Sequence, residues 1–427
     1  MMGHYVDLNY KPNKDDLIVL YYVEKSKECN SLEQACEEIA KESSIGTWTD
    51  IVTMSEDIAE RLRPSAYYIN EPRGLVKIAY TKDLFEANNI SQILSAIAGN
   101  IYGMKALNNL RLLDISFPKD MVKVYKGPKF GIKGIRKLIK VTDRPLLGTI
   151  VKPKVGLNEI EHAKVCGQAW SGGLDIVKDD ENLTSMIFNK FEKRIDETLK
   201  IREKIENETG EKKIYMPNIT APLGIMKKRA DYVMNHGGEY IMLDILTVGF
   251  SALQEIRDYL DDKNMVIHAH RAMHAALTRN KKHGITMLAL SKIMRLIGMD
   301  QLHTGTIVGK MEGGKREVLE CNDILTAQKN FNNNETMLDQ DWGNIKPTLP
   351  VASGGLSPLH VPELIKILGK DIVYQFGGGC HGHPNGTEAG ARAIRQAVDA
   401  SLQGYKLDEY AKNNFELGKA IEKWGRK

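Results

Sequence analysis

The stretch GGLDIVKDDEN, residues 172–182, is the segment that decides the fold class. It joins a short apolar run, Leu174 to Val177, to a lysine and three acids that follow directly. A four-residue run with three apolar side chains, bounded by glycines and charges, is typical of a buried strand. Charges at the end of such a strand mark either a solvated turn or the edge of a functional site, and this stretch alone leaves both open.

The same pattern, an apolar run followed by a segment of helical period, recurs from residue 146 to the end of the chain. The other runs are LLGTIVKP, KIYMPNI, YIMLDIL, MVIHAHR, QLHTGTI, LPVASGG and IVYQFGGG. Eight such units over roughly 250 residues predict an α/β fold of the (β/α)8 barrel type. Eight uninterrupted repeats also disfavour the alternative of a doubly wound open sheet. In a barrel the functional groups lie at the carboxyl ends of the strands.

The residues before the barrel predict a smaller α+β domain. Strand patterns cover residues 17–22 and 74–81, and helical patterns cover 31–41 and 88–98. Residues 117–134, rich in glycine and proline, predict a connection. We therefore expect an N-terminal domain at 1–140, a catalytic barrel at 141–405 and a C-terminal helical extension at 406–427.

Composition narrows the class of protein. The chain has 427 residues, 42% of them hydrophobic and 27% charged, and a net charge of only +4. This balance predicts neither a nucleic-acid nor a membrane partner. Five scattered cysteines without a CxxC pair argue against a disulfide framework, and no apolar run is long enough for a membrane span. We expect a cytoplasmic protein.

Polar groups or glycines stand at the end of every predicted strand. They are Lys152 and Lys154; Lys178, Asp180 and Glu181; Asn218; Asp244; His268, His270 and Arg271; His303 and Thr304; Ser353, Gly354 and Gly355; and Gly377, Gly378 and Gly379. Eight such strand ends predict a functional ring. Glycines after the last two strands let backbone amides approach a phosphate. Arg271 and His303 are potential cations for a second phosphate, so the ring predicts a bisphosphate ligand.

Within the opening stretch, strand period two places Lys178 and Asp180 on the inward face and Asp179 on the opposite one. Asp180 and Glu181 suit a hard cation such as Mg²⁺. A protonated lysine beside them would repel the metal. A buried lysine loses its proton more easily, and its neutral amine can add CO₂ to give an anionic carbamate ligand.

Long motifs along nearly the whole chain resemble those of the large subunit of ribulose-1,5-bisphosphate carboxylase/oxygenase (RuBisCO), most closely the archaeal form III type. They are ESSIGTW (42–48), AGNIYGMKAL (98–107), TDRPLLGTIVKPKVGL (142–157), GGLDIVKDDEN, HAHRAMHAA (268–276), HTGTIVGKMEGG (303–314), PVASGG (350–355) and QFGGGCHGHPNG (375–386).

The resemblance implies a carbon-carbon lyase that carboxylates ribulose 1,5-bisphosphate with CO₂ and water to two molecules of 3-phosphoglycerate. It also implies side oxygenation by O₂, a Mg²⁺-stabilised enediolate, and a place in nucleotide (AMP) salvage. One Mg²⁺ per active site would be held by Asp180, Glu181 and the CO₂-derived carbamate on Lys178. A homodimer with shared active sites, or a higher oligomer of such dimers, is implied without a small subunit.

Residue roles follow from the same resemblance. The implied catalytic residues are Lys152, Lys178, His270 and Lys310. The implied substrate-binding residues are Glu42, Thr47, Trp48, Asn100, Lys154, Arg271, His303, Ser353, Gly354, Gly355, Gln375, Gly377 and Gly378. Two positions depart from the family. Ile176 replaces a phenylalanine, which we expect to be a harmless packing change. Ile150 replaces a threonine, with Thr149 beside it, which puts one contact to a substrate hydroxyl in doubt.

Other functions stay open. A RuBisCO-like enolase or isomerase would use the same metal and base without fixing CO₂. A metal hydrolase with a bridging carbamylated lysine is disfavoured because its HxH pair should precede the lysine, whereas His268 and His270 follow it. A Schiff-base aldolase is disfavoured because the acids around Lys178 would keep that amine protonated. A non-catalytic scaffold gives no reason for the charged ring.

Overall fold

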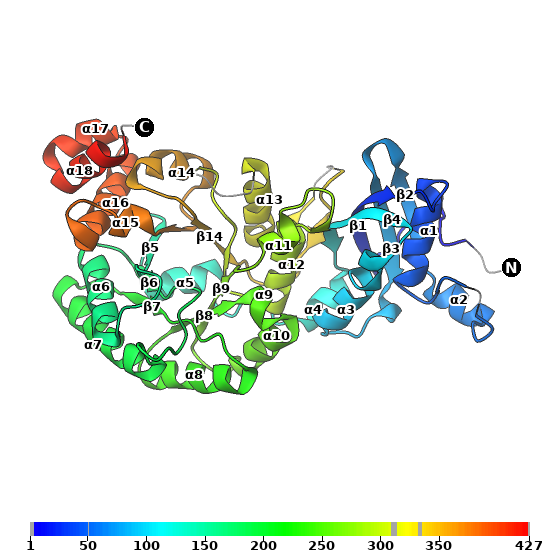
Figure 1. The fold of residues 1–427 in the computed structure, drawn as a ribbon, viewed down its shortest axis with the longest axis horizontal. Helices are drawn as coiled ribbons and strands as arrows, with labels where there is room; N and C mark the ends of the chain where they lie inside the picture. The colour runs from blue at the N-terminus through cyan, green and yellow to red at the C-terminus, as the bar shows by residue number, and fades with distance from the viewer. Residues whose placement is uncertain (1–3, 50, 309–313, 332–334, 426–427) are drawn as a thin grey trace. The chain divides into compact units, whose positions relative to one another are not determined.

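The structure, a computed structural model, describes residues 4–49, 51–308, 314–331 and 335–425. The chain forms two compact units (Figure 1). The first unit comprises residues 1–127, 273–298 and 327–346, and the second comprises 128–272, 299–326 and 347–427. The predicted domain limits at 140 and 405 stay a prediction. Within the described ranges, no helix combines the length and the apolar character that a membrane crossing requires.

The second unit is built on eight parallel strands. They are β5 (Leu146–Ile150), β6 (Ile176–Lys178), β7 (Ile214–Met216), β8 (Tyr240–Asp244), β9 (Val266–His270), β11 (Gln301–His303), β14 (Leu349–Ser353) and β15 (Val373–Phe376). Their order is β7-β6-β5-β15-β14-β11-β9-β8, and a bridge between Asn218 and Met242 joins the two outer strands. The sheet is therefore a nearly closed barrel, which confirms the predicted fold class.

Helices alternate with these strands along the chain, and most of them, such as α6, α7, α8 and α10, lie outside the strands (Figure 1). In the second unit they are α5 (Gly131–Ile139), α6 (Glu159–Ser171), α7 (Phe191–Thr209), α8 (Leu223–Asn235), α9 (Ile245–Val248), α10 (Phe250–Tyr259), α13 (Lys315–Thr326), α14 (Val361–Leu368), α15 (Gly378–His381), α16 (Gly386–Leu402), α17 (Leu407–Tyr410) and α18 (Phe415–Trp424). Local sequence explains the sharp start of α6, where Asn158 and Glu161 form a reciprocal capping box.

The apolar core of the barrel lies at the amino ends of its strands. Leu146, Ile176 and Val373 pack there against Ile135 and Ile139 of α5. Two helices correct a prediction, because residues 117–134 were expected to form a connection but contain α4 (Lys119–Val124) and the start of α5. Gly131 and Gly134 suggested a loop, but burial of the apolar face of α5 outweighs the weak helix propensity of glycine. Ile176 belongs to this core, in agreement with its interpretation as a packing change.

The first unit contains a five-stranded sheet in the order β10-β4-β1-β3-β2. Its strands are β1 (Asp16–Lys25), β2 (Ser65–Asn70), β3 (Leu75–Thr81), β4 (Leu107–Ser116) and β10 (Gly284–Ile285). Its helices include α1 (Leu32–Glu42), α2 (Glu56–Leu62), α3 (Ile90–Ile97), α4 (Lys119–Val124), α11 (Ala275–Thr278) and α12 (Met287–Ile297). The predicted α+β architecture of the N-terminal part is confirmed.

Candidate active site

The carboxyl ends of the barrel strands bring the predicted site residues of the second unit to one end of the sheet. Parallel pairing places Ile150 beside Lys178 and Asp244 beside His270. Paired residues of neighbouring parallel strands point to the same side of the sheet, so these side chains converge.

Lys178 ends β6 and is only 1% exposed. Its Nζ donates to the backbone oxygen of Asp179 at 2.9 Å and lies 3.3 Å from the Sδ of Met242. No ion pair joins this amine to a carboxylate among the contacts of the described residues. Burial lowers the pKa of Lys178 to about 8, although the charges of Glu181 and Asp180 act in the opposite direction. A fraction of the Lys178 amine is therefore deprotonated near neutral pH.

Asp179 points away from this amine, as strand period two predicted. Its carboxylate accepts hydrogen bonds from Tyr215 at 2.6 Å and from Arg194 at 3.0 Å, and His162 lies at 3.2 Å. Burial alone would raise the pKa of Asp179, but the Arg194 charge and these donors hold it well below its ordinary value. This acid is a structural anchor between β6, β7 and the helices outside them.

Asp180 and Glu181 point into the site, and each is paired with a lysine. Lys152 Nζ lies 2.6 Å from Asp180 Oδ2, and Lys154 Nζ lies 3.1 Å from Glu181 Oε1. Burial would raise the pKa of Glu181, but its backbone hydrogen bond, His270 and Lys154 together hold it low. The Glu181 carboxylate is therefore anionic. Across the described parts of the chain, no three His, Cys, Asp or Glu side chains form a metal-binding group.

His270 is held by Asp244, whose Oδ1 lies 2.9 Å from Nδ1 of the imidazole. Asn218 orients that carboxylate by donating to its other oxygen at 3.3 Å. Burial lowers the pKa of His270, and the Lys178 charge lowers it further. The ring is therefore neutral, and with Nδ1 donating to Asp244, its Nε2 is left as a proton acceptor. That nitrogen lies 3.9 Å from Glu181.

His303 corrects a prediction. The sequence suggested a cation here, but burial lowers the pKa of His303 well below its ordinary value, and the neighbouring His268, His270, Lys178 and Arg271 lower it further. The imidazole is therefore neutral. Its Nδ1 lies 2.7 Å from Ser353 Oγ and its Nε2 lies 2.9 Å from Nε2 of His268.

Arg271 remains the cation of this side of the site. It is nearly buried and donates to the backbone oxygen of Thr304 at 3.2 Å. Gly305 has a φ of +102°, and a Cβ on it would lie 2.8 Å from Arg271 Nη2. Glycine is therefore required at 305 both for the backbone conformation and for the guanidinium.

The glycine turns after β14 and β15 have the freedom that close backbone approach needs. Gly354 and Gly355 adopt φ values of +116° and +68°, and no atom lies within 4 Å of the place where a Cβ on Gly378 would stand. Beside them, Gln375 is fully buried, and neither its Oε1 nor its Nε2 has a partner among the described residues. Such an amide needs a partner, and a bound ligand or water would supply one.

Thr149 does not replace the missing hydroxyl at 150. Its side chain is fully buried, donates to the backbone oxygen of Phe376 at 2.6 Å and lies 2.9 Å from Nε2 of His381. Ile150 occupies the strand-end position beside Lys178. The site therefore has an apolar side chain at this strand end.

Of the predicted site residues of the first unit, Glu42 and Asn100 contact each other, whereas Thr47 and Trp48 lie elsewhere in that unit. Asn100 Nδ2 donates to Glu42 Oε1 at 3.3 Å. Thr47 and Trp48 line a separate cavity of about 430 Å³, and the Trp48 ring is 86% exposed. Lys310 lies outside the described residues.

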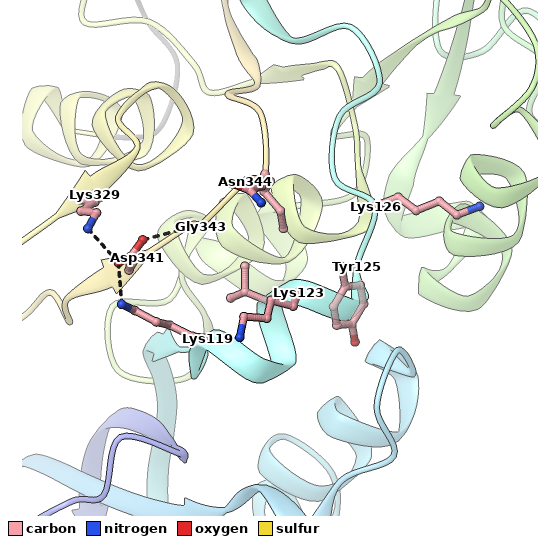
Figure 2. A pocket seen from close by; sticks show the side chains of 10 residues that line it. Lys119, Lys123, Tyr125, Lys126, Lys329, Asp341, Gly343 and Asn344 are labelled. Carbon is pink, nitrogen blue, oxygen red and sulfur yellow. Dashed lines mark hydrogen bonds and ion pairs between the residues drawn. The ribbon is translucent and has the colours of Figure 1, made fainter.

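The first unit also has a cavity of about 450 Å³ that takes no part in this chemistry. Four lysines line it, at positions 119, 123, 126 and 329. Asp341 pairs with Lys119 at 3.3 Å and with Lys329 at 3.1 Å (Figure 2). Lys123 pairs with Asp120 at 3.1 Å. Because three of the four lysines already pair with a carboxylate, we assign no ligand to the cavity.

Sequence reasoning missed two polar groups that support the site, Gln301 and His381. Gln301 accepts from His268, and His381 joins Thr149 to Thr387. For Gln301 a signal existed, since it lies two residues before His303 and thus faces the same side of β11. For His381 the sequence offers none, because it lies in the short helix α15 after the glycine turn.

The fold and the site define a class, a (β/α)8-barrel enzyme with paired carboxylates and a buried lysine at the carboxyl ends of its strands. Two family models match the chain. One, described as "Ribulose bisphosphate carboxylase large chain, catalytic domain", covers residues 131–424. The other, described as "Ribulose bisphosphate carboxylase large chain, N-terminal domain", covers residues 4–121. The chain therefore belongs to the RuBisCO large-chain family.

Individual relatives agree over the whole length. A ribulose bisphosphate carboxylase of Methanocaldococcus jannaschii is 54% identical over 428 residues, with 98% of this chain and 99% of the relative covered. The octameric RuBisCO of Pyrococcus horikoshii, solved with a sulfate ion, has a TM-score of 0.92 at 49% identity, covering 99% and 96% of the two chains. A dimeric archaeal RuBisCO from Hyperthermus butylicus has a TM-score of 0.93 at 44% identity, covering 99% and 98%.

Proposed function

We propose that this chain carboxylates ribulose 1,5-bisphosphate to two molecules of 3-phosphoglycerate, with O₂ as a competing substrate. One observation carries the proposal. Among the described residues, the buried amine of Lys178 has no carboxylate partner, although Asp180 and Glu181 lie only two and three residues further along the chain. The relatives named ribulose bisphosphate carboxylase support it, at 54% to 46% identity.

The residues present fit a Mg²⁺ ion and a carbamate. Asp180 and Glu181 supply two anionic oxygen ligands, and a carbamate formed on Lys178 would supply a third. Without it, the described residues lack a three-ligand group. When bound, the ion and the carbamate would supply a positive charge for developing oxyanions and a base for the C3 proton of the substrate. Binding of the ion would also require Lys152 and Lys154 to release the two carboxylates.

The chain's own side chains provide the remaining functions. Arg271 offers a fixed charge for one phosphate, and the glycine turns at 354–355 and 377–378 offer backbone donors for the other. His270 presents a neutral Nε2 that can take a proton from a substrate hydroxyl. Lys152, once released from Asp180, is proposed to return a proton to the product carbanion. Lys310 is proposed to stabilise the new carboxylate.

We further propose a homodimer with shared active sites, without a small subunit, which assembles from such dimers where the oligomer is larger. The octameric and dimeric states of the two solved relatives support this. Glu42, Thr47, Trp48 and Asn100 would then serve the barrel of a partner chain. Mixing the inactive variants Glu42→Gln and Lys178→Ala should restore part of the activity in hybrid dimers. If mixed dimers form without activity, both groups act within one chain.

Labelled bicarbonate tests the proposed reaction. Enzyme incubated with ribulose bisphosphate, Mg²⁺ and labelled bicarbonate should release labelled 3-phosphoglycerate. Exchange of the C3 proton with solvent, without label in the product, would instead favour the enolase or isomerase function. A place in nucleotide salvage and a cytoplasmic location belong to the same proposal, and deletion of the gene should then impair growth on nucleosides.

A further inference from the structure

Four side chains form a continuous hydrogen-bonded chain that ends at the site. Gln301 Oε1 lies 2.8 Å from His268 Nδ1, and His268 Nε2 lies 2.9 Å from His303 Nε2. His303 Nδ1 lies 2.7 Å from Ser353 Oγ. Gln301, His268 and His303 are buried, so water does not compete for these contacts.

Each contact needs one donor and one acceptor, so the contacts are not independent. The Gln301 oxygen can only accept, so His268 carries its proton on Nδ1. Burial lowers the pKa of His268 to about 3, so this ring is neutral and its Nε2 must accept. His303 then carries its proton on Nε2. Because this ring is also neutral, its Nδ1 accepts, and the Ser353 hydroxyl must donate to it.

We propose that Gln301 is a positioning residue that sets the direction of the Ser353 hydroxyl through His268 and His303. With its proton committed to His303, Ser353 offers only lone pairs to a ligand. It therefore selects a substrate hydroxyl, which can donate, and disfavours a phosphate oxygen, which can only accept. This inference deepens the proposed function and rests on it, since it concerns how a polyhydroxylated bisphosphate is oriented in the site.

Gln301 is suited to this role because, among the described residues, its side chain makes no hydrogen bond other than the one to His268. It pairs in register with His268 on the neighbouring strand, so both side chains leave the sheet on one side. Its Nε2 has no partner among the described residues, which leaves the contact to His268 as the one the amide makes there. An opposite orientation of the amide would reverse every donor in the chain and free the Ser353 proton for a ligand.

A double-mutant cycle separates this role from a structural one. Gln301→Met keeps the volume and removes the acceptor, and we expect kcat/KM for ribulose bisphosphate to fall about three- to tenfold. Ser353→Ala removes the end of the chain. If Gln301 acts through Ser353, the double variant should be no worse than Ser353→Ala alone. Losses that multiply would overturn the proposal.

A matched control is Gln340, a buried glutamine of the first unit whose side chain bonds the backbone of Phe117. Gln340→Met combined with Ser353→Ala should show independent effects, whatever the size of each. Thermal unfolding of every variant establishes that the compared proteins are folded. A cycle at Gln340 as non-additive as that at Gln301 would contradict a specific relay.

Neutron diffraction from deuterated crystals of the free enzyme reads the proton positions directly. We expect deuterium on His268 Nδ1 and His303 Nε2, with the Ser353 hydroxyl directed at His303. Deuterium on His303 Nδ1 would overturn the proposal. This measurement does not depend on turnover. If the wild-type enzyme failed to label 3-phosphoglycerate while the expected protons were observed, the proposed reaction would be wrong and the relay would stand.

Discussion

Two buried lysines, one in each unit, show how different surroundings give the same residue type different roles. Lys292 of α12 is fully buried, and its Nζ lies 2.8 Å from Asp114 Oδ1. The same amine also donates to the backbone oxygens of Ile115 at 2.8 Å and Leu338 at 3.2 Å. Lys178 is almost as deeply buried, but among the described residues its amine contacts only the backbone oxygen of Asp179 and the thioether sulfur of Met242.

The difference is one of charge compensation. Burial lowers the pKa of Lys292, but Asp114 counteracts the shift and gives the ammonium a partner. At Lys178 the acids of the site are near enough to influence the amine without contacting it, and burial prevails. A paired buried lysine fastens one segment to another, whereas an unpaired one is chemically reactive. The predictions below test this distinction.

The largest effect is expected from replacing Lys178. Lys178→Met and Lys178→Arg should both lose carboxylation by more than about a thousandfold, since neither side chain can form the carbamate ligand. Folding stability of Lys178→Met should be unchanged within about 1 kcal/mol or raised, because an uncompensated buried amine is removed. Product formation and chemical denaturation measure the two. Near-normal turnover of either variant would disprove the carbamate.

The same substitution at Lys292 should have the opposite consequence. Lys292→Met leaves the Asp114 carboxylate buried without its cation, which typically costs about 3–5 kcal/mol of folding stability. Denaturant unfolding measures this loss. Adding Asp114→Asn removes the orphaned charge and should recover part of it. Equal stabilities of Lys178→Met and Lys292→Met would contradict the distinction drawn here.

The sequence alone predicted which side chains around Lys178 face the site. It did not predict which groups of the site are charged, because charge depends on neighbours from other strands. Period two along β6 correctly placed Lys178 and Asp180 on one face and Asp179 on the other, because strand geometry is local. The same reasoning could not foresee that His303 is neutral. Its protonation depends on burial and on Lys178 and His268, which come from other strands.

Helix α5, which packs against the amino ends of the barrel strands, was not predicted for a similar reason. Helix α5 contains two glycines that indicate a loop when they are considered alone. Its helical state depends on the apolar strand residues it packs against, and some of these, such as Ile214 and Val373, are distant in sequence. The family resemblance supplied residue roles that neither periodicity nor composition contains, and Lys310 is still known only in that way.

The reactivity of Lys178 should appear as a pH dependence of activation. Its pKa is lowered to about 8, so the neutral amine is scarce at pH 7 and predominant at pH 9. At fixed dissolved CO₂ and Mg²⁺, the rate of activation should rise roughly tenfold between pH 7 and pH 9 and then level off. The measurement is the lag before steady turnover after mixing. A rate that still rises steeply above pH 9 would indicate an ordinary, solvated lysine.

The smallest effect is expected at a third buried lysine, Lys213, which lies between the two cases. Its Nζ pairs with Glu211 at 2.6 Å and donates to the backbone oxygen of Leu174 at 3.1 Å. Glu211 is 43% exposed and has Arg395 at 3.7 Å, so it keeps both water and a cation when the lysine is removed. Lys213→Met should therefore cost only about 1 kcal/mol, mainly for the lost hydrogen bond to Leu174. Denaturant midpoints of Lys213→Met and Lys292→Met, measured side by side, should show the smaller loss of stability for Lys213→Met. If the loss at Lys213 equalled that at Lys292, burial of the lysine itself would govern stability, and the exposure of its partner would not matter.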